Sequence, residues 1–337
     1  MSKKISVIIP AYNAQNTVLR AINSVCENAY GNIEIIVVND GSTDDTAKVV
    51  EHKQREDKRI ILLNQENAGV SHARNNGIQA ATGEILMFLD ADDAYSSCYC
   101  GKIAEAFEKE QTDIVLSGYN EIYKNNTIQR QCPILGTVEK ESIFSDIIEP
   151  FYFSGKYKFM GSVWLAGFKR KLITDHKVRF HEKVKRAEDT LFLVSSLMCA
   201  ERVSLIEGCY YHYNLADSTA TKKYSSYLCR NNEILSDEWK ALFKKHGYEY
   251  TAEYAGNAAV ANVFSILVNE ARDGNPNSFL QQIKAAFKAN EFYKNDLKKS
   301  RPLSSKGKVK KYIAKSQILC AMFYIVRRVQ RTFGVEF

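Results

Sequence analysis

The hydrophobic pattern of the first 90 residues alternates between short apolar runs and longer amphipathic segments. Mostly apolar runs, typical of strands buried on both faces of a sheet, occur at 5–9, 33–38, 60–63 and 84–89. Between these runs, the residues recur with helical spacing. Three strand–helix repeats followed by a strand predict an α/β fold of the mostly parallel type, with helices flanking the sheet.

The pattern after residue 93 is mixed and then almost wholly helical. We predict further strands and helices before residue 220, among them strands at 113–119 and 208–215 and helices at 144–152 and 187–200. The stretch 162–173 has the pattern of a strand or turn that enters a helix. We therefore predict three parts, which are an α/β domain at 1–220, a helical extension at 221–297 and a basic amphipathic tail at 298–337.

The length and composition indicate a globular protein without a membrane-spanning segment. The chain has 337 residues, which is more than one core usually holds. It contains no run of 18 apolar residues, and the five apolar residues before Pro10 are too few for the core of a signal peptide. We therefore expect a cytoplasmic protein. Its 8 cysteines form no C-x-x-C pair, which favours free thiols over zinc or disulfides.

The positive charge is concentrated at the C-terminus. The chain carries a net charge of +7, and residues 298–337 hold about +10, which leaves about −3 for the remainder. This distribution argues against nucleic acid as a partner. The apolar run Ile318–Val326 is too short to span a bilayer, and basic residues flank it. We expect this tail to contact an anionic membrane surface, at the inner face of the plasma membrane, although a helix packed on the main domain is the alternative.

Polar residues follow three of the predicted strands directly. The first strand ends at Pro10-Ala11-Tyr12-Asn13, the second at Asn39-Asp40-Gly41-Ser42 and the fourth at Asp90-Ala91-Asp92-Asp93. Open α/β sheets bind ligands beyond the carboxyl ends of their strands. We therefore expect these polar residues to converge on one edge of the sheet.

The three aspartates of "LDADD" lie close together at the end of a buried strand, so something must offset the repulsion between their carboxylates. Residues two apart in an extended segment can point to one side, so Asp90 and Asp92 can share a hard divalent cation. Mg²⁺ and Mn²⁺ are usually held by one or two carboxylates together with substrate phosphates. The alternative is that one aspartate caps the next helix while the others are solvated.

Three further motifs carry residues suited to a nucleotide. Asp40 can accept hydrogen bonds from a base or ribose, and Ser42 can approach a phosphate, unless the motif is only a tight strand-to-helix turn. In "NAGVSHARNNG", Arg74 can face a diphosphate. In "RAEDTLF", Glu188 and Asp189 point about 100° apart on a helix, so we expect separate roles for them; the alternative is a purely structural charge at a helix N-terminus.

Together these motifs resemble family 2 glycosyltransferases, which have the GT-A fold. "VIIPAYN", "VVNDGSTDDT", "NAGVSHARNNG", "FLDADD" and "AEDTLF" stand in the family's order across residues 5–215. The resemblance implies a UDP-linked sugar donor and inversion at the anomeric carbon. It implies that Asp189 is the catalytic base, and that Asp92 binds the metal that bridges the diphosphate.

The resemblance also guides the assignment of the other site residues. It implies that Asp40 contacts the base, that Asp90 lies near the ribose or the metal, and that Pro10, Tyr12 and Asn13 line the nucleoside pocket. We include Ser42, Asn67, Arg74 and Glu188 among the predicted substrate-binding residues. His212, in "YYHYN", is a candidate second metal ligand, and the alternative for it is a strand histidine between aromatics. Trp164 can stack on a sugar or lie in the core.

We therefore expect a metal-dependent, inverting hexosyltransferase that uses Mn²⁺ or Mg²⁺. It would move a hexose or N-acetylhexosamine from a UDP-sugar to a hydroxyl of a growing surface glycan, such as a capsule or exopolysaccharide, whose acceptor can be lipid-linked. A nucleotidyltransferase is the alternative enzyme, but "PAYNAQNT" lacks the glycine-rich basic loop that a triphosphate needs. A non-catalytic nucleotide-sugar-binding scaffold at the membrane predicts loss of the acids, and all of them are present.

Overall fold

The computed structural model describes residues 2–154, 156–157, 159, 161–215, 227–270 and 298. The chain divides into two compact units, of which the first comprises Met1–Ile148 and Phe159–Ser218 and the second Glu149–Lys158 and Thr219–Phe337. The domain boundaries expected after 220 and 297 stay a prediction. The expected basic tail lies outside the described residues, apart from Lys298.

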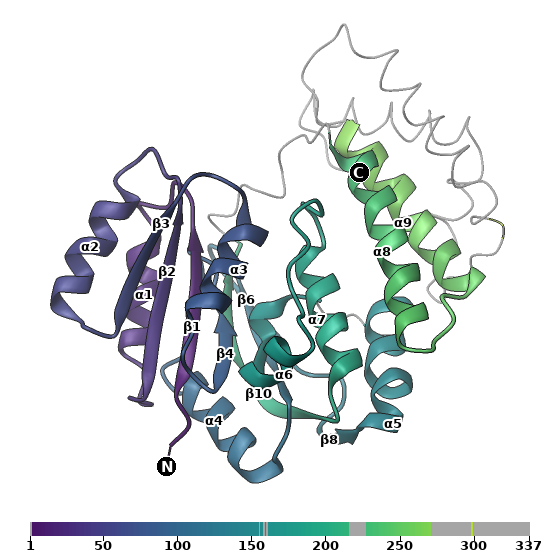
Figure 1. Cartoon of the computed structure of the whole chain (residues 1–337), viewed down its shortest axis with the longest axis horizontal. Coiled ribbons are helices and arrows are strands. Elements are labelled where there is room, and N and C mark those ends of the chain that lie inside the picture. The colour runs from purple at the N-terminus through teal and green to yellow at the C-terminus, as the bar shows by residue number, and fades with distance from the viewer. Residues whose placement is uncertain are drawn as a thin grey trace, which may run out of the picture. The chain divides into compact units, whose positions relative to one another are not determined.

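The first unit is built around a ten-stranded sheet, with strand order β3-β2-β1-β4-β9-β6-β10-β5, to which β7 adds on β6 and β8 on β10 (Figure 1). Its strands are β1 (Ile5–Ala11), β2 (Ile33–Asp40), β3 (Ile60–Gln65), β4 (Ile85–Phe88), β5 (Ala94–Tyr95), β6 (Ile114–Ile122), β7 (Thr127–Arg130), β8 (Gly136–Glu139), β9 (Ala166–Lys169) and β10 (Arg202–Asn214). The four strands expected in the first 90 residues pair parallel, as does β6 with β10. In contrast, β9 runs antiparallel to both β4 and β6.

Helices follow most of these strands, which confirms the predicted α/β fold class. They are α1 (Val18–Cys26), α2 (Thr46–Glu56), α3 (Val70–Ala80), α4 (Tyr99–Glu110), α5 (Lys140–Ile143), α6 (Arg170–Asp175) and α7 (Glu188–Cys199). A π-helix, η1 (Phe144–Phe153), and a 3-10 turn, η2 (Val163–Leu165), complete the set. The stretch expected to enter a helix from a strand or turn does so through η2, β9 and α6.

The core beneath β4 is aromatic. The ring of Phe88, at the end of β4, meets the rings of Phe168 and Phe180 edge-on at centroid distances of 6.0 and 5.4 Å. Phe180 in turn stacks on Phe192 of α7 at 4.1 Å. Such pairs favour defined ring geometries, and here they fix the end of β4 relative to α7. The segment that follows Phe88 carries the acids of interest.

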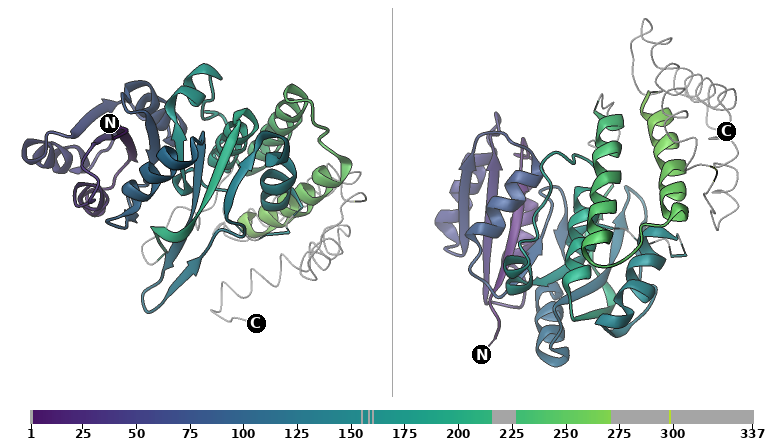
Figure 2. Two further views of the ribbon diagram at one scale, coloured as in Figure 1. Left: turned by 90° about the horizontal axis from the view of Figure 1, so that it is seen from below. Right: turned by 45° about the vertical axis from the view of Figure 1, so that its right-hand side comes forward.

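The second unit contains the helices α8 (Leu228–Lys245) and α9 (Ala252–Glu270), which lie side by side (Figure 2). Phe153 packs within it against Trp239 and Phe243, at centroid distances of 5.2 and 5.0 Å. These helices confirm the predicted helical C-terminal region over their own length. Within the described part of the chain, no helix combines the length and apolar character needed to cross a bilayer.

A buried glutamate forms hydrogen bonds that connect the amino-terminal ends of β1 and β2 to the turn before β4. Glu34 on β2 accepts hydrogen bonds from Lys4 Nζ at 2.6 Å, Ser6 Oγ at 2.5 Å and the Thr82 N–H at 2.7 Å. Burial acts to raise the pKa of Glu34, but these hydrogen bonds outweigh it and lower the pKa to about 2. The carboxylate therefore joins β1, β2 and the turn before β4.

We expect Glu34→Gln to destabilise the fold by about 2–3 kcal/mol at pH 7, because an amide cannot accept all of these bonds. A lowered pKa in the folded state gives stability that is present above the ordinary value of 4.5 and is lost as the pH falls toward about 2. The difference in the free energy of unfolding between wild type and Glu34→Gln should therefore become smaller as the pH falls from 4.5 toward about 2. Urea unfolding from pH 7 downward measures it. Glu84→Gln is the control, since its ion pair with Lys3 is exposed; an equal loss in both variants would contradict the assignment.

Candidate active site

Hydrogen bonds join the loop after β1 to the loop after β2. Asn13, whose φ of 48° lies in the left-handed region, donates its N–H to Ser42 Oγ at 3.0 Å and accepts the Thr43 N–H through Oδ1 at 2.8 Å. Pro10 lies buried just before this junction, and Tyr12 beside it is 52% exposed. The structure thus brings Pro10, Tyr12, Asn13 and Ser42 to one edge, and their role in binding a nucleoside stays a prediction.

Asp40, at the end of β2, holds the loop that leads into α3. Its Oδ1 accepts hydrogen bonds from Gln65 Nε2 and the Ala68 N–H, and its Oδ2 accepts the Gly69 N–H, all at 2.8 Å. Asn67 closes the same turn by donating Nδ2 to the Asp40 carbonyl oxygen at 3.0 Å. Asp40 is only 3% exposed, so its carboxylate is first of all a structural anchor.

A buried arginine connects the two acidic motifs. Arg74, on α3, donates Nη2 to Asp90 Oδ1 at 2.9 Å and Nη1 to Glu188 Oε1 at 3.1 Å. Its guanidinium also lies 5.2 Å from the centre of the Phe180 ring. The acids after β4 and at the start of α7, which are 98 positions apart in the sequence, therefore share one cation. The expected role of Arg74 in facing a diphosphate stays a prediction.

The third acid of "LDADD" has a structural role. Asp93 is 1% exposed and accepts hydrogen bonds from the Tyr211 hydroxyl at 2.5 Å and the Asn214 N–H at 2.7 Å. The Tyr211 hydroxyl also accepts the Asp90 N–H at 3.3 Å. Burial, helped by the charge of Asp90, raises the pKa of Asp93 to about 8. Sequence reasoning missed this residue because its partners lie on β10, about 120 positions later.

Asp92 lies between these two anchored acids and is half-buried. Its carbonyl oxygen accepts a hydrogen bond from Arg20 of α1, which fixes the backbone of the loop. Asp90 remains about one-third exposed despite its bond to Arg74, with a side-chain exposure of 30%. The loop therefore presents two partly accessible carboxylates, Asp90 and Asp92, on a backbone held from both sides.

The Glu-Asp pair begins α7, after Ala187 in a left-handed conformation with φ of 64°. Glu188 is bound to Arg74, whereas Asp189 accepts the Thr190 N–H through Oδ1 at 2.8 Å. Burial and the charge of Glu188 raise the pKa of Asp189 to about 6, against the opposing charge of Arg74. A carboxylate with such a pKa is suited to accept a proton near neutral pH.

His212 and Trp164 have other neighbours. His212 Nε2 lies 2.9 Å from Ser96 Oγ, and its side chain alternates with that of Tyr211 along β10. Because Tyr211 reaches Asp93, His212 lies on the opposite face of the strand; the structure does not bring it to the acids, and its role as a metal ligand stays a prediction. Trp164 is 3% exposed and stacks on Tyr211 at 4.0 Å, which places it in the core.

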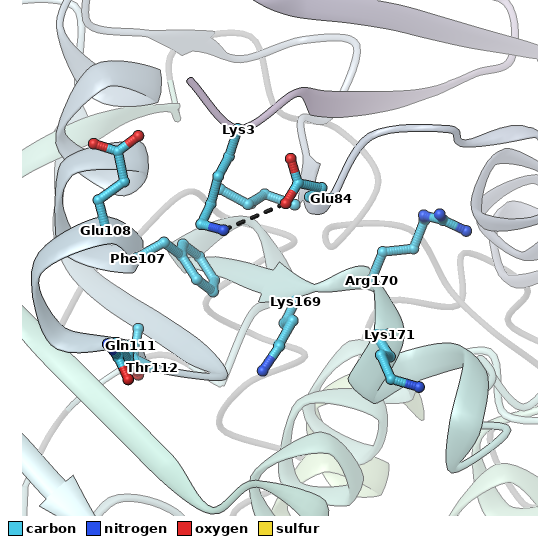
Figure 3. Close-up of a pocket in the computed structure, with 10 residues that line it drawn as sticks. Lys3, Glu84, Phe107, Glu108, Gln111, Thr112, Lys169, Arg170 and Lys171 are labelled. Atoms are coloured by element: carbon cyan, nitrogen blue, oxygen red, sulfur yellow. Dashed lines mark hydrogen bonds and ion pairs between the residues drawn. The ribbon is translucent and has the colours of Figure 1, made fainter. Parts of the chain in front are cut away.

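A cavity of about 800 Å³ lies at the other edge of the sheet (Figure 3). Lys3, just before β1, forms an ion pair with Glu84, just before β4, at 3.3 Å across its wall. Lys169, the last residue of β9, and Arg170, the first residue of α6, line it as well. These residues lie at the amino ends of β1 and β4, whereas the acids lie at the carboxyl ends. The cavity is therefore separate from the acidic site.

Comparison with known proteins identifies the family. Residues 6–173 match the family model described as Glycosyl transferase family 2. The chain belongs to this family. An uncharacterized glycosyltransferase, EpsJ of Bacillus subtilis, is 31% identical to it over 220 residues, which cover 65% of this chain and 63% of EpsJ. The chain thus spans less than two thirds of that relative's length.

Two solved structures share the fold. TarS of S. aureus in complex with UDP-GlcNAc matches with a TM-score of 0.66 at 18% identity, over 99% of this chain and 93% of that one. A mannosyltransferase of Pyrobaculum calidifontis, PcManGT, in complex with GDP-Man and Mn²⁺, matches with a TM-score of 0.53 at 16% identity, over 100% and 89% of the two chains. The predicted GT-A fold is confirmed.

We expect Arg74→Met to destabilise the protein by about 3 kcal/mol, since it leaves Glu188 buried and Asp90 partly buried without their shared cation. Arg74→Lys should cost less, because an ammonium keeps the charge but lacks the planar fork that binds two carboxylates. Urea unfolding at pH 7 measures both.

Arg230→Met is the matched control for this substitution. Arg230 pairs with Glu233 on α8 at 3.0 Å, and both side chains are exposed, at 67% and 39%, so the loss should stay below about 1 kcal/mol. A loss for Arg74→Met as small as that of the control would show that the bridge does not stabilise the site.

Proposed function

We propose that the protein is an inverting glycosyltransferase that moves a hexose or N-acetylhexosamine from a UDP-sugar to a hydroxyl of a growing surface glycan. The observation that carries this proposal is the convergence of two acidic groups on Arg74. One group follows β4 and the other begins α7, so acids for a leaving group and for a nucleophile lie at the same edge of the sheet. Inversion needs two such groups with separate tasks.

The nucleotide side of the site would be formed by the loops after β1, β2 and β3. Tyr12 is exposed beside the hydrogen bond that joins Asn13 to Ser42. The hydrogen bond from Asn67 to Asp40 shapes the turn before α3. Helix α3 then begins at Val70, close to the N–H groups that Asp40 orders. A UDP donor is favoured by the family resemblance and by the UDP-GlcNAc complex of the TarS structure.

The carboxylates fit a divalent cation that is shared with substrate. Among the described residues, no cluster of three or more His, Cys, Asp or Glu side chains could hold a metal by itself. Two partly accessible carboxylates, Asp90 and Asp92, are what Mg²⁺ or Mn²⁺ commonly takes from a protein when phosphate oxygens complete its shell. When bound there, the cation would neutralise the charge of the diphosphate leaving group.

Asp189 would accept the proton of the acceptor hydroxyl. Its raised pKa lets it take that proton as the hydroxyl oxygen attacks the anomeric carbon from the face opposite the diphosphate. Glu188 is held by Arg74 and would keep the start of α7 in place while Asp189 acts. The two adjacent acids would thereby divide positioning and chemistry between them.

The acceptor we propose is a glycan hydroxyl, presented on a capsule or exopolysaccharide precursor that can be lipid-linked. The expected basic tail at 298–337 would bring the enzyme to an anionic membrane surface, at the inner face of the plasma membrane. Screening by salt weakens such contacts, because they depend on charge.

The donor and metal assignments can be tested by calorimetric titration with UDP-, GDP- and TDP-sugars, with and without Mn²⁺. We expect UDP-sugar binding that depends on Mn²⁺ and weakens at least about tenfold in Asp92→Ala, because one cation ligand is lost. Asp45→Ala should bind as wild type does, since Asp45 is an exposed acid at this edge that pairs with Lys48. Binding that is equal in Asp92→Ala and wild type would refute the metal assignment.

The proposed base predicts a pH profile. Because Asp189 acts only when ionised, the transfer rate should fall about tenfold per pH unit below a pKa of about 6 and level off above it. Asp189→Asn should lose about 10²–10⁴-fold in rate while it still binds the donor. Initial rates from pH 4.5 to 8 measure this, and a substantial residual rate in Asp189→Asn with an unchanged acid limb would exclude Asp189 as the base.

A further inference from the structure

A polar network lies behind Asp40 at the ends of β2 and β3. Gln65, the last residue of β3, donates Nε2 to Asp40 Oδ1 at 2.8 Å, and the same nitrogen lies 3.1 Å from His72 Nδ1. Asn76, one turn further along α3, donates Nδ2 to Gln65 Oε1 at 2.7 Å. The network therefore joins Asp40 to two residues of α3 through a single amide, that of Gln65.

The chemistry of Asp40 sets the orientation of that amide. Three N–H donors meet the Asp40 carboxylate, so it acts as an acceptor, and Gln65 must turn its NH₂ group toward it. The second hydrogen of that NH₂ group then faces His72 Nδ1, which has to accept it. The reversed amide would place an oxygen against the carboxylate and would also leave the Asn76 donor facing an NH₂ group.

The carboxylate retains capacity for one further donor. An ionised carboxyl offers about four acceptor positions, and Oδ1 already receives two hydrogen bonds while Oδ2 receives one. The remaining position, on Oδ2, suits a ring N–H. Uracil presents such an N–H at its N3 position, whereas cytosine presents a lone pair there, which an acceptor repels.

We propose that Gln65 is a positioning residue that keeps the Asp40 carboxylate oriented as an acceptor, and so makes the site prefer uracil over cytosine nucleotides. This inference rests on the proposed function, in which Asp40 contacts the base of the donor. Gln65 itself needs no contact with the nucleotide. Its effect passes through the Asp40 carboxylate, to which no other side chain among the described residues donates a hydrogen bond.

The test is calorimetric titration of UDP and CDP, with Mn²⁺ present, into wild type, Gln65→Glu and Gln65→Leu. Wild type should bind UDP at least about tenfold more tightly than CDP, because a site built around one hydrogen bond rejects the analogue that lacks it. Gln65→Glu would set two carboxylates side by side, which must share a proton or move apart. UDP binding should then weaken about tenfold while CDP binding stays equal or improves.

Gln65→Leu removes the donor without adding an acid, and should reduce the UDP preference by a smaller factor. Asn64→Asp is the matched control, because it adds one negative charge to the neighbouring residue of β3 and keeps an oxygen for Asn39 Nδ2, which lies 2.8 Å from Asn64 Oδ1. It should leave the ratio of the UDP and CDP affinities unchanged.

A purely structural role for Gln65 gives a different result. UDP and CDP binding would then weaken by the same factor in both variants, and the unchanged ratio would overturn the inference while the proposed function stands. A wild type that binds UDP and CDP equally would overturn it too. A wild type that binds neither nucleotide would refute the proposed function, and the inference with it.

Discussion

The ion pairs of Arg74 are the interaction on which the acidic site depends. Asp90 and Glu188 are 98 positions apart in the sequence, and both would repel their acidic neighbours if no cation lay between them. The guanidinium suits this place because its planar fork binds two carboxylates at once and stays charged when buried. Phe180 covers its face, and the same ring packs on Phe88 and Phe192, so the aromatic core and the ion pairs hold the same two elements.

The three acids after β4 are tolerated for three different reasons. Asp90 has the cation of Arg74, and Asp93 has the Tyr211 hydroxyl and the Asn214 N–H. Asp92 is half-buried, with its backbone fixed through Arg20. Repulsion among the acids at this strand end is therefore limited, because Asp90 and Asp93 are each bound by other residues of the protein. Asp92 and the exposed part of Asp90 remain accessible on this fixed backbone. That arrangement favours a shared cation over simple solvation.

The sequence predicted what depends on local pattern and missed what depends on distant contacts. The apolar runs that became β1, β2, β3 and β4 were identified because parallel strands buried on both faces are apolar at most of their positions. The antiparallel strand β9, at 166–169, is too short to show a pattern. Similarly, whether the face of Tyr211 or that of His212 meets the acids depends on how β10 pairs in the sheet, which the sequence leaves open.

Site residues divide in the same way. Motif order marked Asp40, Asp90, Asp92, Glu188 and Asp189, whose chemistry is visible in one short segment each. Neither the pairing of Arg74 with two acids nor the burial of Asp93 can be seen in such segments, because each bond joins residues far apart in the chain. Gln65 was not predicted as a site residue for a related reason, because a single glutamine at the end of a strand forms no recognisable motif with its neighbours in the sequence.

The use of Asp40 shows why structural and binding roles need not compete. Most of its acceptor positions are occupied by the Gln65 amide and by two N–H groups of the turn before α3. Those bonds cost the site some freedom, but they fix the carboxylate before any ligand arrives, so that little ordering remains for binding itself. A carboxylate with all positions free would adapt to any neighbour. A carboxylate with a single acceptor position left accepts a hydrogen-bond donor at that position and repels an acceptor. The selectivity for a base therefore follows from the number of acceptor positions that the protein itself already occupies.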